Sequence, residues 1–125
     1  MIRIGLVGVG RGRIVQLVAH RPDVRFAAVC DPCLEVASVR DRIMGEIRAA
    51  GAEFDAVYTD YDRFLEHDFD VAVIASPAPL HARQSIAALR HGKDVICEVP
   101  AVTDLHEARE LVVAVRETGR RYLFA

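Results

Sequence analysis

Cysteine, excess positive charge and long apolar stretches are all scarce in this sequence, and each shortage excludes a class of protein. Only 3 of the 125 residues are cysteines, an odd number that argues against a framework of disulfide bonds. Lysine and arginine (16) do not outnumber aspartate and glutamate (18), so the basic surplus typical of nucleic-acid-binding proteins is missing. No apolar run approaches the roughly 18 residues that span a membrane, and a first strand from Ile2 leaves no room for a signal peptide. We therefore expect a cytoplasmic protein with neither nucleic-acid nor membrane partners.

What the sequence does contain is a regular alternation of apolar patterns. The length suits one domain, and 52% hydrophobic with 27% charged residues is ordinary for a globular fold. Hydrophobic periodicity predicts strands at residues 2–8, 24–30, 55–59, 71–75, 94–97 and 122–124. It predicts helices at residues 12–20, 32–50, 61–67, 79–91 and 104–118.

This alternation predicts an α/β fold in which one domain occupies residues 1–125. Continuous apolar strands separated by helices are typical of a parallel sheet that is covered on both faces. Because crossover connections are right-handed, we expect a doubly wound Rossmann sheet with strand order 3-2-1-4-5-6. Helical spacing assigns apolar residues of two helices to the core: Val36, Val39, Ile43, Ile47 and Ala50 in helix 32–50, and Leu105, Ala108, Leu111, Val112 and Val115 in helix 104–118.

The turn after the first strand is rich in glycine. It reads Gly8-Val9-Gly10-Arg11-Gly12-Arg13. Glycines permit a tight turn and a close approach of the backbone to a pyrophosphate, which the N-terminus of the following helix would then hold. The match to G-x-G-x-x-G is imperfect, because Arg13 takes the third position and the extra glycine comes one residue early. Taken alone, the turn is a weak signal for a dinucleotide and is also compatible with a loop shaped only by packing.

An acidic residue follows at the spacing that dinucleotide-binding folds use. Asp31 ends the second strand, 21 residues after Gly10, where a carboxylate can accept hydrogen bonds from the hydroxyls of an adenosine ribose. A carboxylate there repels the 2′-phosphate of NADP, so NAD is the expected cofactor and NADP is disfavoured. Asp31 is also well suited to cap a helix before Pro32, and the two roles are compatible.

Three motifs together resemble the Gfo/Idh/MocA oxidoreductases, the relatives of glucose-fructose oxidoreductase and inositol dehydrogenase. They are the glycine turn, Ser76-Pro77-Ala78-Pro79-Leu80-His81, and Gly92-Lys93-Asp94-Val95-Ile96-Cys97-Glu98-Val99-Pro100. The resemblance covers the whole chain and implies an N-terminal NAD(P)-binding Rossmann domain. It also implies a second α/β domain, absent from this chain, that supplies most of the substrate pocket and the oligomer interface. The implied reaction transfers hydride between a nicotinamide and a sugar, cyclitol or related polyol, and we expect the 125 residues alone to be inactive.

The resemblance also implies a role for individual residues along the cofactor. The resemblance places the pyrophosphate against the glycines and the backbone that follows them, namely Gly8, Gly10, Arg11, Gly12, Arg13 and Ile14. Asp31 falls on the adenosine ribose, and Ser76 and Pro77 border the cofactor at the end of the fourth strand.

At the nicotinamide end the resemblance is incomplete. Glu98 matches the glutamate that contacts the nicotinamide ribose, and Pro100 is expected to follow a cis peptide bond. His81 matches a histidine near the nicotinamide and is the candidate catalytic residue. Val99, however, occupies the position of a lysine that assists proton transfer in many members, and valine can neither ionise nor donate a hydrogen bond.

Two other functions remain compatible with these residues. Loss of the lysine would suit a non-catalytic protein that senses NAD(P) and regulates other proteins. Cys30 and Cys33 form a C-x-x-C motif that would suit a small redox protein, although coincidence is the better explanation of the spacing. No second C-x-x-C completes a tetrahedral site and no histidines stand at ligand spacing, so we expect no metal.

Overall fold

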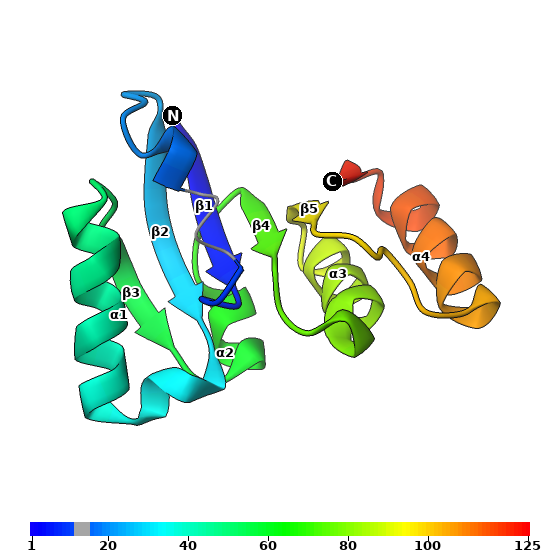
Figure 1. Cartoon of the computed structure of the whole chain (residues 1–125). Coiled ribbons are helices and arrows are strands. Elements are labelled where there is room, and N and C mark those ends of the chain that lie inside the picture. Colours follow the sequence, from blue (N-terminus) through cyan, green and yellow to red (C-terminus); the bar gives the residue numbers. More distant parts are fainter. Residues whose placement is uncertain (12–15) are drawn as a thin grey trace.

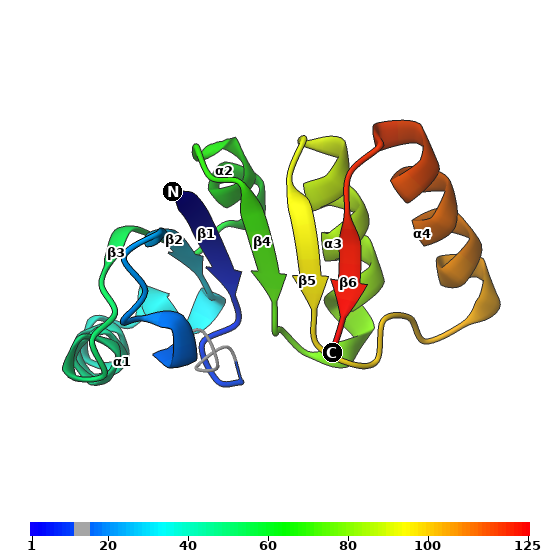
Figure 2. The same cartoon turned by 90° about the horizontal axis from the view of Figure 1, so that it is seen from above.

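A single parallel sheet forms the centre of the molecule. The computed structural model describes residues 1–11 and 16–125. Its strands are β1 (Ile2–Val7), β2 (Val24–Cys30), β3 (Phe54–Tyr58), β4 (Val71–Ile74), β5 (Asp94–Cys97) and β6 (Tyr122–Phe124). All adjacent strands pair in parallel, in the order β3-β2-β1-β4-β5-β6 (Figure 2). The predicted Rossmann topology is confirmed.

Helices cover both faces of the sheet, and each face has its own hydrophobic core. The α-helices are α1 (Ala37–Ala49), α2 (Tyr61–Glu66), α3 (His81–Arg90) and α4 (Leu105–Thr118) (Figure 1). Buried side chains of α1 pack on one face of β1 and β2, while α2, α3 and α4 pack on the other face. No helix in the described part of the chain is long and apolar enough to cross a membrane.

The segment after β2 departs from the predicted helix 32–50. Pro32–Glu35 forms a separate 3-10 helix, η2, and the backbone at Val36 is extended (φ −80°, ψ 114°) before α1 begins. Val36 stands at this break, before α1 begins, and is 55% exposed. Ala50 is the residue that ends α1 and is exposed, while Ile43 and Ile47 inside the helix remain buried. The predicted inward positions of Val36 and Ala50 were therefore wrong.

Two further helices also differ in detail from the prediction. Of the expected helix 12–20, residues 16–18 form a 3-10 turn, and residues 12–15 lie outside the described part of the chain. In α4, Leu111 and Ala114 are buried, whereas Leu105 (76%) and Val112 (48%) are exposed. Leu105 lies six residues before Leu111, about 240° around the helix, so both cannot face the sheet. The predicted burial of Leu105 and Val112 was wrong.

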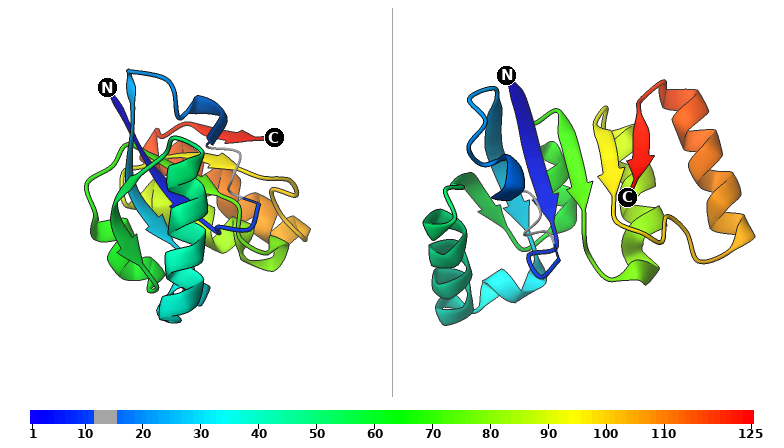
Figure 3. Two further views of the ribbon diagram at one scale, coloured as in Figure 1. Left: turned by 60° about the vertical axis from the view of Figure 1, so that its left-hand side comes forward. Right: turned by 45° about the horizontal axis from the view of Figure 1, so that its top comes forward.

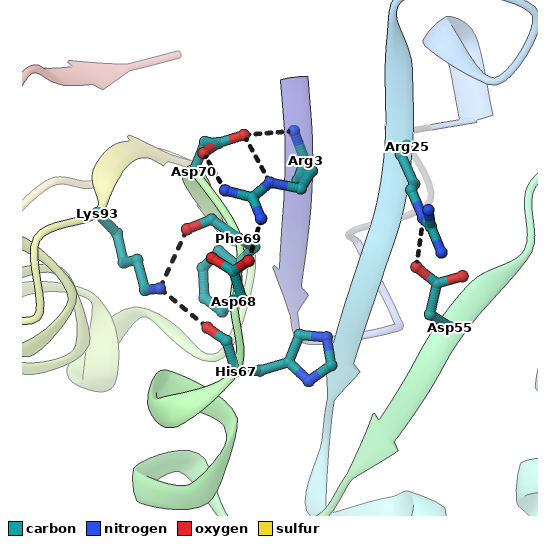
Figure 4. A network of polar contacts seen from close by, with 8 residues as sticks. All are labelled: Arg3, Arg25, Asp55, His67, Asp68, Phe69, Asp70 and Lys93. Atoms are coloured by element: carbon teal, nitrogen blue, oxygen red, sulfur yellow. Dashed lines mark hydrogen bonds and ion pairs between the residues drawn. The ribbon is translucent and has the colours of Figure 1, made fainter. Parts of the chain in front are cut away.

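Polar contacts fix the amino ends of the strands, at the edge opposite the predicted site (Figure 4). The Arg3 guanidinium donates to both Asp68 and Asp70, which lie just before β4, and the Asp70 contact measures 2.8 Å. The amino group of Lys93, just before β5, donates to the carbonyl oxygens of His67 (2.9 Å) and Phe69 (3.0 Å). These contacts leave the carboxyl edge of the sheet to the glycine turn and the loops after β4 and β5.

Candidate functional site

The loops after the strands meet at one edge of the sheet, because all strands of a parallel sheet point the same way (Figure 3, right). A cavity of about 420 Å³ opens at this edge, next to the ends of β1, β2 and β4. Gly8, Asp31, Ser76 and Pro77 line it. Four of the residues predicted to border a cofactor, spread over much of the sequence, thus share one cavity.

The two described glycines of the turn differ in what requires them. Gly8 has φ +89°, and a Cβ on it would lie 2.5 Å from the carbonyl carbon of Ala75, so the fold itself demands glycine there. Among residues 1–11 and 16–125, no atom apart from those of its two chain neighbours lies within 4 Å of the position that a Cβ on Gly10 would take. Packing against the described residues therefore does not explain Gly10, and these residues leave the space beside its backbone open to a ligand. The predicted contacts Gly12, Arg13 and Ile14 lie outside the described residues.

Asp31 links the glycine turn to the start of η2. Its Oδ1 accepts a hydrogen bond from the Cys33 amide (2.9 Å), which is the capping role anticipated from the sequence. Its Oδ2 accepts a second bond from the Val9 amide (3.1 Å) inside the glycine turn. A carboxylate has about four acceptor positions, so this partly exposed side chain can still accept ribose hydroxyls.

Side chains from α2 and α3 fix the turn after β4. The hydroxyl of Ser76 donates to Oε1 of Gln84 in α3, and both residues are largely buried. The phenol of Tyr61 donates to the backbone carbonyl of Gln84 at 2.6 Å. Burial raises the pKa of Tyr61, which keeps the phenol protonated as this bond requires. The turn after β4 is therefore bonded to α3 through Gln84, and α3 is in turn bonded to α2 through Tyr61.

The loop after β5 carries the remaining predicted residues. A carboxylate oxygen of Glu98 lies 3.2 Å from a guanidinium nitrogen of Arg11, so an ion pair joins this loop to the glycine turn. Val99 is 51% exposed and offers no polar group to the edge. The peptide bond between Val99 and Pro100 is cis, as the resemblance implied.

His81 is placed differently from an ordinary proton-transfer residue. Its side chain is only 1% exposed. Its Nδ1 lies 2.7 Å from the carbonyl oxygen of Pro100, and its Nε2 lies 2.6 Å from the carbonyl oxygen of Ser76. Both ring nitrogens are thus already engaged by backbone groups.

The cysteines of the C-x-x-C motif are free thiols. Burial raises the pKa of Cys30 to about 12, and partial desolvation with a hydrogen bond to Asp31 raises the pKa of Cys33 to about 11. A thiol must lose its proton to act as a nucleophile, so neither cysteine is activated at neutral pH. Within the described ranges, no three His, Cys, Asp or Glu side chains gather to hold a metal ion.

The residues that support the site from α2 and α3 were not predicted from the sequence. Gln84 stands between Arg83 and Ser85 in the sequence, so no local pattern marks it as buried. The signal that could have found it is its place on the inner face of α3, because a buried polar side chain needs a hydrogen-bond partner. Tyr61 and Thr59 also line the cavity, and both come shortly after β3. No motif marks either of them in the sequence. The Arg11–Glu98 ion pair joins residues 87 positions apart, and no local pattern announces it.

Comparisons with known proteins agree with this fold. Residues 2–125 match the family described as an oxidoreductase family with an NAD-binding Rossmann fold. Inositol 2-dehydrogenase of Rhodococcus jostii is 30% identical over 98% of this chain and 32% of its own length. The scyllo-inositol 2-dehydrogenase (NADP(+)) of Bacillus subtilis is 30% identical over 95% of this chain and 35% of its own length. A crystal structure of scyllo-inositol dehydrogenase from Lactobacillus casei, with bound NAD(H) and scyllo-inositol, superposes with a TM-score of 0.81 at 26% identity, covering 100% of this chain and 36% of that one. The chain spans about a third of the length of the curated relatives it matches.

Proposed function

The chain belongs to the Gfo/Idh/MocA oxidoreductase family, in its NAD-binding Rossmann domain, and from this premise we propose that it binds NAD for hydride transfer to or from a polyol. The observation that carries the proposal is the shared cavity of Gly8, Asp31, Ser76 and Pro77 at the carboxyl edge of the sheet. Dinucleotides bind at this edge in doubly wound sheets, beside the point where the strand order reverses. Here that point lies between β1 and β4.

The residues present fit the phosphates and the adenosine of such a cofactor. The described residues leave room beside Gly10 for a pyrophosphate against the backbone. We propose that the pyrophosphate is also contacted by Arg11 and by Gly12, Arg13 and Ile14, which lie outside the described residues. Asp31 would accept the ribose hydroxyls with the acceptor positions that Val9 and Cys33 leave. Ser76 and Pro77 would border the adenosine from the turn after β4.

The nicotinamide end falls to the loop after β5. A bound nicotinamide supplies hydride transfer at its C4 atom. Glu98 would accept a hydrogen bond from the nicotinamide ribose, which requires its carboxylate to exchange Arg11 for a ribose hydroxyl or to bind both. Val99 cannot hold or move a proton, so we propose that the proton of the substrate hydroxyl passes to a group outside these 125 residues.

The preference for NAD over NADP follows from the charge on Asp31. A carboxylate that faces a 2′-phosphate in a partly desolvated site costs at least 1–2 kcal/mol, or about tenfold or more in affinity. A relative whose name specifies NADP(+) has the same 30% identity to this chain as the inositol 2-dehydrogenase of Rhodococcus jostii. The choice between NAD and NADP therefore depends on the residues of this site rather than on the family.

The substrate class is proposed from the relatives. Their names specify inositols, which are cyclitols, and a sugar, cyclitol or related polyol is the class we propose for the full-length protein. The relatives are about three times as long as this chain, which supports a second domain that holds the substrate and forms the oligomer interface.

Calorimetric titration of the 125-residue chain with NAD and with NADP tests the proposal. We expect NAD to bind at least about tenfold more tightly than NADP, and Asp31→Asn to remove most of that difference. Glu35→Gln removes one nearby negative charge from the exposed end of η2 and serves as the matched control. Failure of the unaltered chain to bind either dinucleotide would refute the proposed function. Equal affinities would refute the role of Asp31 alone.

A further inference from the structure

The side chain of His81 joins two loops that come from different strands. Ser76, whose carbonyl oxygen lies 2.6 Å from Nε2, belongs to the turn after β4. Pro100, whose carbonyl oxygen lies 2.7 Å from Nδ1, belongs to the loop after β5. The ring lies between them at the first residue of α3, shielded from solvent. Both loops run along the carboxyl edge of the sheet (Figure 3, right).

The chemistry of these contacts fixes the direction of the hydrogen bonds. A carbonyl oxygen can only accept, so each bond needs a hydrogen on the ring nitrogen. The imidazolium form makes both bonds at once, and a neutral ring makes one of them. In either form, both nitrogens face backbone carbonyls rather than the open edge. The ring thus presents no nitrogen with which to exchange a proton with a substrate.

We propose that His81 is a positioning residue that sets the spacing between the turn carrying Ser76 and the loop carrying Glu98. This inference rests on the proposed function, because the spacing matters only if one ligand spans both loops. NAD is such a ligand: its adenosine half would border Ser76, and its nicotinamide ribose would reach Glu98.

Contacts around the ring support this assignment. Ser76 is held by α3 twice, through its carbonyl oxygen at His81 and through its hydroxyl at Gln84, one helical turn later. The loop after β5 is held at the Glu98 amide, which donates to the carbonyl oxygen of Ile74 at 2.9 Å. Two residues beyond Glu98, the Pro100 carbonyl is held by His81. Side chains of the first turn of α3 therefore contact both loops: His81 and Gln84 contact the turn after β4, and His81 also contacts the loop after β5.

A substitution that breaks one contact and keeps the other separates positioning from general stability. The amide nitrogen of glutamine extends to about the place of Nε2, so His81→Gln retains the bond to Ser76 and loses the bond to Pro100. ADP serves as the second ligand, because it carries the adenosine half of NAD without the nicotinamide ribose. His91→Gln is the matched control: His91 stands at the other end of α3, exposed, with Nδ1 2.8 Å from the carbonyl oxygen of Ala87.

We expect His81→Gln to weaken NAD binding about tenfold, while ADP affinity stays within about twofold of the parent. His91→Gln should leave both affinities unchanged. NAD affinity that is unchanged in His81→Gln, or that falls in step with ADP affinity, would overturn the inference while leaving the proposed function intact. A parent chain that binds neither ligand would overturn the proposed function and this inference with it.

A second measurement covers the case in which His81→Gln does not fold. In the unaltered chain, labelled uniformly with nitrogen-15 and carbon-13, NMR couplings across hydrogen bonds connect a ring nitrogen to the carbonyl carbon that it contacts. Couplings from His81 to both Ser76 and Pro100, measured at a pH low enough to protonate the ring and kept when NAD is added, are the expected result. Loss of the Pro100 coupling on addition of NAD would overturn the inference, because the ring would then have released the loop it is proposed to position.

Discussion

Gly10 offers the sharpest separation of ligand binding from folding in this domain. Nothing in the described structure lies within 4 Å of the position that its Cβ would take. Gly10→Ala should therefore change the free energy of unfolding by no more than about 0.5 kcal/mol, as is usual for a surface substitution. If a pyrophosphate approaches this backbone, the same methyl group occupies the space that the phosphates need.

The loss of affinity can be worked from the hydrogen bonds at stake. Displacing the phosphates from the turn breaks at least one charge-assisted bond to a backbone amide, which is worth about 1.5–3 kcal/mol. We expect the Kd for NAD to rise roughly ten- to hundredfold. Calorimetric titration measures the Kd, and urea unfolding of the same samples measures stability.

Gly8→Ala is the matched contrast, because it should act on the fold instead. At φ +89° a non-glycine residue costs about 1–2 kcal/mol in backbone conformation, before any clash. The added Cβ would also lie 2.5 Å from a backbone carbon of Ala75, which cannot move without disturbing β4. Gly10→Ala that binds NAD as tightly as the parent, or that unfolds as easily as Gly8→Ala, would refute the reasoning about this turn.

Three further predictions follow from other parts of the molecule. Glu98→Ala should weaken NAD binding by roughly 1.5–3 kcal/mol through a lost charge-assisted bond, and unchanged binding in calorimetry would remove this loop from the nicotinamide end. Hydrogen bonds from Arg3 lower the pKa of Asp70, so this carboxylate stabilises the fold above its unfolded pKa of about 4 and that stability is lost as pH falls through the lower folded value. Asp70→Asn should flatten the acid side of a pH–stability curve measured by urea unfolding, and an unaltered acid slope would contradict this. The 125-residue chain should produce no NADH above background with any polyol. Positioning of the substrate against the cofactor lowers the barrier by about 7–11 kcal/mol, and we expect residues outside this chain to provide it. Cofactor-dependent oxidation of a polyol by the chain alone would disprove this.

The sheet could be predicted from the sequence because its strands are short apolar runs that nearly all end in recognisable turns. Order and direction followed from the handedness of crossovers, which does not depend on side-chain detail. The break at Val36 could not be predicted, because the helical spacing of apolar residues continues across it. The backbone at Val36 is nevertheless extended and separates η2 from α1. The exposed side of α4 was misjudged for a related reason: Val112 is apolar, but only one side of that helix meets the sheet.

The candidate site was predictable wherever a backbone constraint or a motif marked it. Gly8 and Asp31 directly follow β1 and β2, and the carboxyl ends of parallel strands are where this fold binds its ligands. The engagement of both nitrogens of His81 could not be foreseen, because one of its partners is a backbone carbonyl 19 residues away. The same limitation applies to Gln84, whose partners come from two other elements.

Mapping NAD onto the backbone amides of the labelled chain by NMR tests most directly whether a dinucleotide binds along the carboxyl edge. We predict saturable shifts at Val9 and Gly10, at Asp31 and Cys33, and at Ser76 and Glu98. No shifts are expected at the opposite edge, around Arg3, Asp70 and Lys93. Shifts confined to that opposite edge or to the outer surfaces of α3 and α4, or no saturable shifts at all, would contradict binding at the carboxyl edge.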